Sequence, residues 1–163
     1  MKKINHTLVY PGASLDQVVA MVSDPAFREA VADYQGVVRR SVSVTGEVPA
    51  KRIEVELVHG TERVPSFAKK FVGDEIPIVQ VETWTSDTAA DVEVTIPGKP
   101  GEMVGSATLT TSGDDVVETM ELEVRVKIPL VGGKIEDLIA GLLVKAFKAE
   151  NKVGLKWLAG EWN

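Results

Sequence analysis

Cysteine is absent from this sequence. Its absence excludes disulfide bonds, thiolate catalysis and zinc sites with cysteine ligands. Histidine is scarce as well, because His6 and His59 are the only two, and they lie far apart in the chain without a carboxylate at ligand spacing. We therefore expect no metal site, no cofactor and no catalysis by a metal or a thiolate.

Long apolar runs are also missing. No window approaches the roughly 18 apolar residues of a membrane-spanning helix, and Lys134, Lys145 and Lys148 interrupt the longest apolar stretches. Near the N-terminus, the polar residues 5–7 interrupt the run of about seven apolar residues that a signal peptide requires. We expect a cytoplasmic protein without integral association with membranes.

Positive charge is in deficit, since 18 Lys and Arg residues face 24 Asp and Glu residues, for a net charge of −6. A nucleic-acid-binding protein usually carries a basic face, so we expect no nucleic-acid partner. Apolar residues make up 44% of the 163 residues, which is enough for one core. This length suits one domain, which we expect to span residues 1–163.

Two helices are predicted directly after a first strand. Residues 4–10 alternate between polar and apolar side chains, as a strand does, and a Pro-Gly pair ends the pattern. Ser14 is a good N-cap for one short helix, and Asp24 followed by Pro25 begins a second. Neither helix is basic enough to read DNA, so we interpret the pair as packing elements.

The middle of the chain has the period-two pattern of strands with one dry face. Six such segments lie within residues 38–44, 53–57, 79–82, 92–96, 103–111 and 120–128. With the first strand they predict a seven-stranded antiparallel sheet. A possible short helix at residues 66–71 interrupts the series, and Gly73 is suited to end it.

The last segment, residues 134–158, returns to helical spacing with one broad apolar face. Only this helix is long enough to cover one face of the sheet. The sequence therefore predicts an α+β helix-grip fold: a curved seven-stranded antiparallel sheet, two short helices after the first strand and a long C-terminal helix. This arrangement commonly leaves a cavity between sheet and helix.

The order of elements resembles the START and Bet v 1-like superfamily, also described as SRPBCC or polyketide cyclase-like. The phrases YPGASLDQVVAMVSDPAF, VPSFAKKFVGDEIPIVQVETW and IPLVGGKIEDLI with a final LKWL are similar to an actinobacterial branch of it. The resemblance covers nearly the whole chain. It implies binding of lipids, sterols, polyketides or other apolar ligands, and it carries over no catalytic motif. One scaffold in this superfamily serves transporters, cyclases, receptors and co-chaperones, so fold does not fix function.

Three functional hypotheses follow. The first is non-catalytic carriage or sensing of a small apolar ligand by a monomer or weak homodimer. The second is a polyketide cyclase-type enzyme with Tyr10, Arg40 and His59 as its polar groups. The third is a protein-interaction module whose core fills the cavity. The candidate cavity-lining residues are Arg40, Val55, Leu57, His59, Trp84, Met120, Leu122, Leu138, Leu142 and Phe147.

Alternatives remain for three of these candidates. Arg40 shares the parity of apolar neighbours, so it is either an anchor for an acidic head group or a rim residue turned outward. His59 is either a polar contact at the cavity mouth or a turn residue before a glycine. Trp84 shares its parity with Glu82, which calls for a bulge or a strand end to bring it inside. The carboxylates Glu54, Glu56, Glu118, Glu121 and Glu123 are either paired for acid–base chemistry or part of a solvated outer sheet face. We interpret them as the outer face, because basic residues at 52, 125 and 127 share it and offer cross-strand partners.

Overall fold

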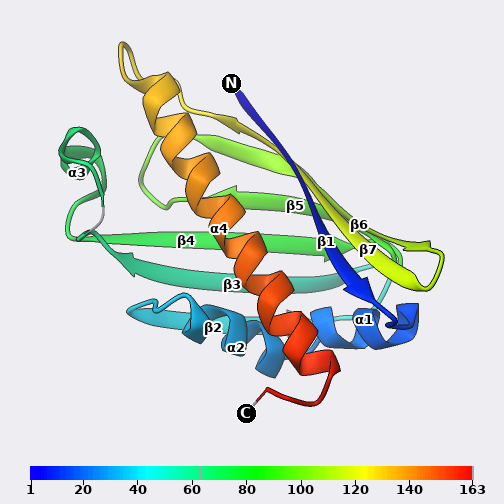
Figure 1. Cartoon of the computed structure of the whole chain (residues 1–163). Helices are drawn as coiled ribbons and strands as arrows, with labels where there is room; N and C mark the ends of the chain where they lie inside the picture. The colour runs from blue at the N-terminus through cyan, green and yellow to red at the C-terminus, as the bar shows by residue number, and fades with distance from the viewer. Residues whose placement is uncertain (63, 163) are drawn as a thin grey trace.

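One antiparallel sheet and one long helix dominate the computed structural model, which describes residues 1–62 and 64–162 (Figure 1). The side chains of residues 71 and 72 lie outside this description. The elements in chain order are β1 (Lys2–Pro11), α1 (Leu15–Val22), α2 (Pro25–Tyr34), β2 (Arg39–Thr45), β3 (Lys51–Gly60), α3 (Ser66–Val72), β4 (Glu75–Trp84), β5 (Ala89–Thr95), β6 (Glu102–Ser112), β7 (Asp115–Arg125) and α4 (Gly132–Leu158).

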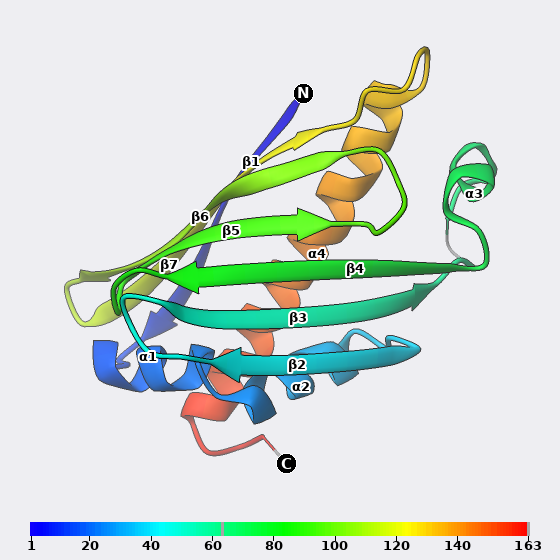
Figure 2. The same ribbon diagram turned by 180° about the vertical axis from the view of Figure 1, so that it is seen from behind.

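The seven strands form one sheet in the order β1-β7-β6-β5-β4-β3-β2, with antiparallel neighbours throughout. The sheet curves around α4, and α1 and α2 lie at one end of it (Figure 1). Seen from behind, the opposite face of the sheet carries none of the helices of the described residues (Figure 2). The predicted helix-grip fold is confirmed.

Side-chain caps begin the two short helices where the sequence predicts. Ser14 Oγ accepts a hydrogen bond from the Gln17 backbone N–H at 3.1 Å, and Gln17 Oε1 accepts one in return at 2.9 Å. Asp24 Oδ1 accepts from the Ala26 N–H at 2.9 Å. These bonds satisfy N–H groups that have no partner within the helix. The pair of helices lies beneath the C-terminal half of α4 (Figure 1), where the rings of Phe27 and Trp157 meet with centroids 5.6 Å apart.

The core fills most of the space between α4 and the concave face of the sheet. Buried side chains of α4 pack with those of the strands along its length. The α4 contribution includes Ile135, Ile139, Leu143, Phe147 and Val153. The largest fully buried strand residues are Leu8, Tyr10, Ile53, Trp84, Val94, Met103, Val116, Leu122 and Val124. None of the helices in the described residues combines the length and the apolar character that crossing a membrane requires.

Two glycines allow close approaches that shape this core. A Cβ at Gly105 of β6 would overlap the backbone carbonyl oxygen of Glu121 on β7. A Cβ at Gly154 of α4 would lie 2.6 Å from the buried ring of Tyr10. The sheet therefore bends tightly at the first position, and the helix passes close over β1 at the second.

The end of β7 differs from the prediction. The strand stops at Arg125 rather than residue 128, because the Val126 N–H donates to Glu136 Oε2 at 2.8 Å instead of continuing the ladder. The Gly132 N–H then donates to the Ile128 carbonyl at 2.9 Å, so α4 begins two residues earlier than expected. Glu136 thus ties the start of α4 to the end of the sheet.

Candidate functional site

Three hollows that share lining residues lie between the sheet and α4. An inner cavity of about 60 Å³ lies between α2, β3, β4, β7 and α4. A groove of about 510 Å³ lies outside it, between the end of α2, the segment before α3, and α4. A third hollow of about 40 Å³ lies beneath the N-terminal half of α4. Leu142 lines all three, so it stands at the junction between the groove and the two inner spaces.

The structure brings most of the predicted lining residues together around this junction. Those that line the inner cavity are Val55, Leu57, His59, Met120, Leu142 and Phe147. Leu138 lines the groove and the third hollow. Period-two parity on β3 and the apolar stripe of α4 identify these side chains because each pattern marks the concave side.

Arg40 lies elsewhere. Its Nε donates to Asp33 Oδ1 at 2.8 Å, and its guanidinium also pairs with Glu29, both on α2. It lines none of the three hollows between sheet and helix. β2 is an edge strand of the sheet, and α2 runs beside it. Arg40 is therefore an exposed rim residue rather than an interior anchor.

Trp84 and Leu122 lie deep in the core instead of lining the inner cavity. Trp84 reaches the interior together with Glu82, which points inside as well, and the Trp84 indole N–H donates to Glu82 Oε1 at 3.0 Å. Leu122 pairs with Ile4 and Gly105 on the neighbouring strands. Both residues support the walls of the space without reaching its surface.

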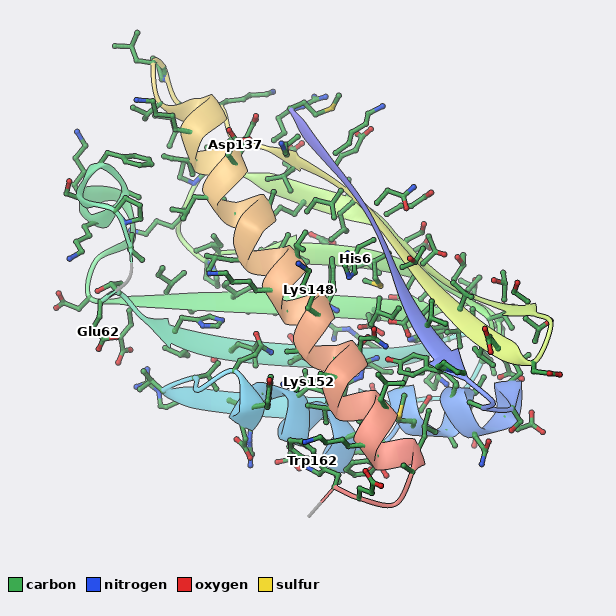
Figure 3. All side chains as sticks on the ribbon, in the orientation of Figure 1. His6, Glu62, Asp137, Lys148, Lys152 and Trp162 are labelled. Carbon is green, nitrogen blue, oxygen red and sulfur yellow. The ribbon has the colours of Figure 1, made fainter. Side chains whose placement is uncertain are left out.

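The two histidines occupy different places. His59 lines both the inner cavity and the groove, and burial lowers its pKa, so the ring is neutral at neutral pH. The ring of His6 stacks on Phe147 with centroids 6.1 Å apart. Burial and the nearby Lys148 ammonium lower the pKa of His6, and Figure 3 shows the two side chains beside α4. Among the described residues, no group of three His, Asp or Glu side chains is arranged to hold a metal ion.

A buried group of four ionisable residues lies at one end of the inner cavity, and we call Arg28, Glu82, Glu118 and Glu150 the charged cluster. Two of its members, Arg28 and Glu150, line the cavity. Arg28 Nη1 and Nη2 donate to the two oxygens of Glu82 at 2.8 Å each, and Arg28 Nε donates to the Val22 carbonyl at 2.7 Å. This bidentate geometry is the strongest form of an arginine–carboxylate pair.

Glu82 is fully satisfied. Besides Arg28, it accepts hydrogen bonds from Trp84 Nε1 and from Gln80 Nε2, the latter at 2.7 Å. Burial would raise its pKa, but Arg28 and these donors hold the pKa of Glu82 below its usual value. Burial alone would lower the pKa of Arg28, but the negative charges of Glu82 and Glu150 outweigh this effect and raise the pKa of Arg28. Arg28 and Glu82 therefore form a closed, neutral ion pair.

Glu118 and Tyr10 are the unsatisfied members of this region. Glu118 Oε2 and the Tyr10 hydroxyl are buried without a hydrogen-bond partner among the described residues. Burial, followed by the charge of the Glu150 carboxylate and a hydrogen bond to that carboxylate, raises the pKa of Glu118 well above its usual value. Burial raises the pKa of Tyr10, and the nearby carboxyl groups of Glu150 and Glu118 raise it further. At neutral pH both side chains hold their protons.

The interpretation of Glu118 as part of a solvated outer face is wrong. Glu118 shares the parity of Met120 and Leu122, which places it on the concave face, where it is 3% exposed. This shared parity is the feature of the sequence that indicates the buried position of Glu118. Glu150 likewise lies three residues after Phe147 on the buried stripe of α4. Arg28 gave no such signal, because its partners lie 54 and 122 residues away.

Solved structures share this architecture at low sequence identity. Protein TTHA0849 from Thermus thermophilus has a TM-score of 0.65 at 15% identity, with 98% of each chain covered. A START superfamily protein from Mycobacterium smegmatis has a TM-score of 0.53 at 16% identity, covering 93% of this chain and 97% of the other. The di-domain ARO/CYC protein StfQ from the steffimycin biosynthetic pathway has a TM-score of 0.67 at 11% identity, covering 97% of this chain and 50% of the other.

These likenesses establish a START-like fold. None of the curated proteins compared matches the sequence significantly. One family, described as protein of unknown function DUF2505, matches residues 5–158. Because this match includes all four helices of the described residues and nearly all of the sheet, the chain belongs to the DUF2505 family.

Proposed function

We propose that the protein binds a small, mainly apolar ligand between the sheet and α4, without transforming it. The observation that carries this proposal is the meeting of a groove and two inner hollows at Leu142. The two inner hollows are lined mostly by aliphatic and aromatic side chains, as in small-molecule sites generally, whereas the groove also carries Gln35, His59, Glu62 and Lys145. The START-like fold supports the same role.

The volumes limit how such a ligand lies. Sites for drug-sized ligands measure roughly 300–1,000 Å³. The groove, at about 510 Å³, falls in this range, whereas the inner cavity, at about 60 Å³, does not. The main body of the ligand therefore lies in the groove, and only one end passes Leu142 into the inner cavity.

A fluorescent apolar probe tests this proposal. N-phenyl-1-naphthylamine should bind the wild-type protein with enhanced emission. Leu142→Trp should weaken binding by at least about tenfold, because the indole fills the junction. Leu155→Trp is the matched control, since Leu155 is an exposed residue of the same helix, and it should leave binding unchanged. Absence of binding, or equal loss in both variants, would reject the proposal.

A cyclase-type enzyme is the second candidate. It is favoured by one observation, the buried and protonated Glu118 and Tyr10 behind the polar end of the cavity, since buried acids are common proton donors in catalysis. Mass spectrometry distinguishes the two functions. A β-polyketone incubated with the protein should be recovered unchanged, and its conversion with loss of water would favour the enzyme.

A further inference from the structure

The charged cluster holds more negative than positive charge. Arg28 contributes one positive charge, and Glu82 and Glu150 each contribute one negative charge, while Glu118 is protonated. The sum is one negative charge, buried at the end of the inner cavity. A buried charge without a partner is costly, so this end of the cavity is suited to a cation.

Glu150 is the carboxylate that faces the cavity with its charge least satisfied. Its one cationic partner among the described residues is Arg28 Nη1, at the long distance of 3.3 Å, and that nitrogen also serves Glu82. The protonated carboxyl group of Glu118 donates a hydrogen bond to Glu150, which uses one of its acceptor positions. An ionised carboxylate has about four acceptor positions, and Glu150 lines the inner cavity. It is therefore available to a ligand, whereas Glu82 is not.

Glu118, which is hydrogen-bonded to Glu150 behind the cavity wall, has a second oxygen without a partner in the described part of the chain. Its Oε2 is buried without a hydrogen bond to the described residues, and it lies on the same face of β7 as Met120, which lines the cavity. On the adjacent strands Leu8 and Leu109 pair with it and carry no charge. The titratable groups around it are Tyr10 from β1, Arg28 from α2, Glu82 from β4 and Glu150 from α4.

We propose, building on the function above, that the inner cavity receives the protonated amine of a ligand whose apolar part lies in the groove. An ammonium group has three N–H donors, which suit the free capacity of Glu150 and of Glu118 Oε2. A carboxylate ligand would instead add a further uncompensated negative charge to this end.

The protonated amine makes this region neutral while Glu118 keeps its proton. Arg28 and the ammonium group then oppose Glu82 and Glu150, so two positive charges balance two negative ones. The proton on Glu118 leaves one of its oxygens as an acceptor for the ammonium group. No proton needs to be exchanged with solvent in this complex, and the amine itself compensates the buried charge of Glu150.

Three probes that share one apolar chain test this inference at neutral pH by isothermal titration calorimetry: n-octylamine, 1-octanol and octanoate. We expect octylamine to bind at least about tenfold more tightly than octanol, and octanoate to bind most weakly. Equal affinity for the three, or tighter binding of octanoate, would overturn the inference. This comparison needs only the wild-type protein, so it does not depend on the folding of a variant.

Variants then identify the carboxylate responsible. Glu150→Gln should remove the preference for octylamine while leaving octanol affinity within about twofold. Glu121→Gln is the control, because Glu121 lies on the outer face of β7 beside Asn5, and it should keep the preference. A preference that survives Glu150→Gln would overturn the inference.

The same experiment separates this inference from the proposed function. If octanol binds as well as octylamine and Leu142→Trp weakens both, the apolar site exists and the amine inference fails. If none of the three probes binds, and N-phenyl-1-naphthylamine does not bind either, the proposed function fails, and the inference fails with it.

Discussion

Arg28 supplies the positive charge beside three buried carboxyl groups, so the polar end of the cavity depends on this residue. Arg28→Met would leave Glu82 buried without a counterion. Removal of one partner from a buried ion pair costs about 3–5 kcal/mol, and we expect a loss of this size in the free energy of unfolding, measured by urea denaturation.

Arg40→Met is the matched control for that substitution. Arg40 also pairs with two carboxylates, but its pair with Glu29 and Asp33 lies at the exposed rim, where solvent screens the charges. The urea midpoint should therefore barely move. A similar loss in both variants would show that burial does not decide the strength of the Arg28 pair.

Glu118 gives the protein a stability that depends on pH. Its pKa is raised in the folded state, so above the unfolded pKa of about 4.3 the unfolded chain releases a proton that the folded chain keeps. The free energy of unfolding then falls as pH rises, by up to about 1.4 kcal/mol per pH unit, until the folded pKa is reached.

Glu118→Gln removes this titration. The variant should be more stable than the wild type at neutral pH, and the two should converge as pH falls toward about 4. Glu82 does not obscure the comparison, because its pKa is lowered and its contribution is lost only at more acidic pH. Urea denaturation over a pH series measures the effect, and parallel curves for both proteins would contradict it.

The position of a single side chain, buried or exposed, was predictable from the sequence only where a local alternation of polar and apolar residues indicates which face of the sheet it occupies. The parity of Val55, Leu57 and His59 placed them on the concave face, and they line the cavity. The parity of Glu118 also indicated the concave face, but its grouping with the nearby carboxylates Glu121 and Glu123 led to the opposite interpretation. Arg28 depends on partners from β4 and α4, which no local pattern brings together.

At the scale of elements, α4 places one glycine against a side chain and another in open space. A Cβ at Gly154 meets the Tyr10 ring at 2.6 Å, whereas a Cβ at Gly141 meets nothing within 4 Å. Gly141→Ala should stabilise the protein by about 0.5–1 kcal/mol, the difference in helix propensity.

Gly154→Ala carries the same gain in propensity but must displace a fully buried ring. We expect it to lower the thermal unfolding midpoint, while Gly141→Ala raises it; differential scanning calorimetry of both variants provides the measurement. An increase in both midpoints would mean that α4 moves away from β1 at little cost.

Elements were more predictable than their ends. The caps Ser14 and Asp24 fixed the starts of α1 and α2, because each uses a side chain within three residues of its partner. The end of β7 was not predictable in this way. It depends on Glu136, which bonds the Val126 N–H from a different element.

At the scale of the whole molecule, α4 is the one helix of the described residues that crosses the concave face of the sheet over its full width (Figure 1). Removing residues 134–163 would expose Met120, Leu122 and Val124. Each fully buried large apolar side chain contributes about 1.5–3 kcal/mol, and a domain is stable by only about 5–15 kcal/mol. The truncated chain should unfold or aggregate.

Near-ultraviolet circular dichroism and size-exclusion chromatography of the truncated chain measure this outcome. A monomer with a cooperative unfolding transition would show instead that the sheet is stable without α4, and that α4 acts as a lid alone.

Gly105 limits how a protein of this shape can diverge. Every other amino acid at this position would force β6 away from β7 and flatten the bend that the sheet makes toward α4. Leu142 bears no such restriction, because the space beside it is open. In a library of random substitutions selected for folding, we expect many residues at position 142 and only glycine at position 105. Ligand preference would then be free to evolve, while the curvature of the sheet that encloses the ligand would not.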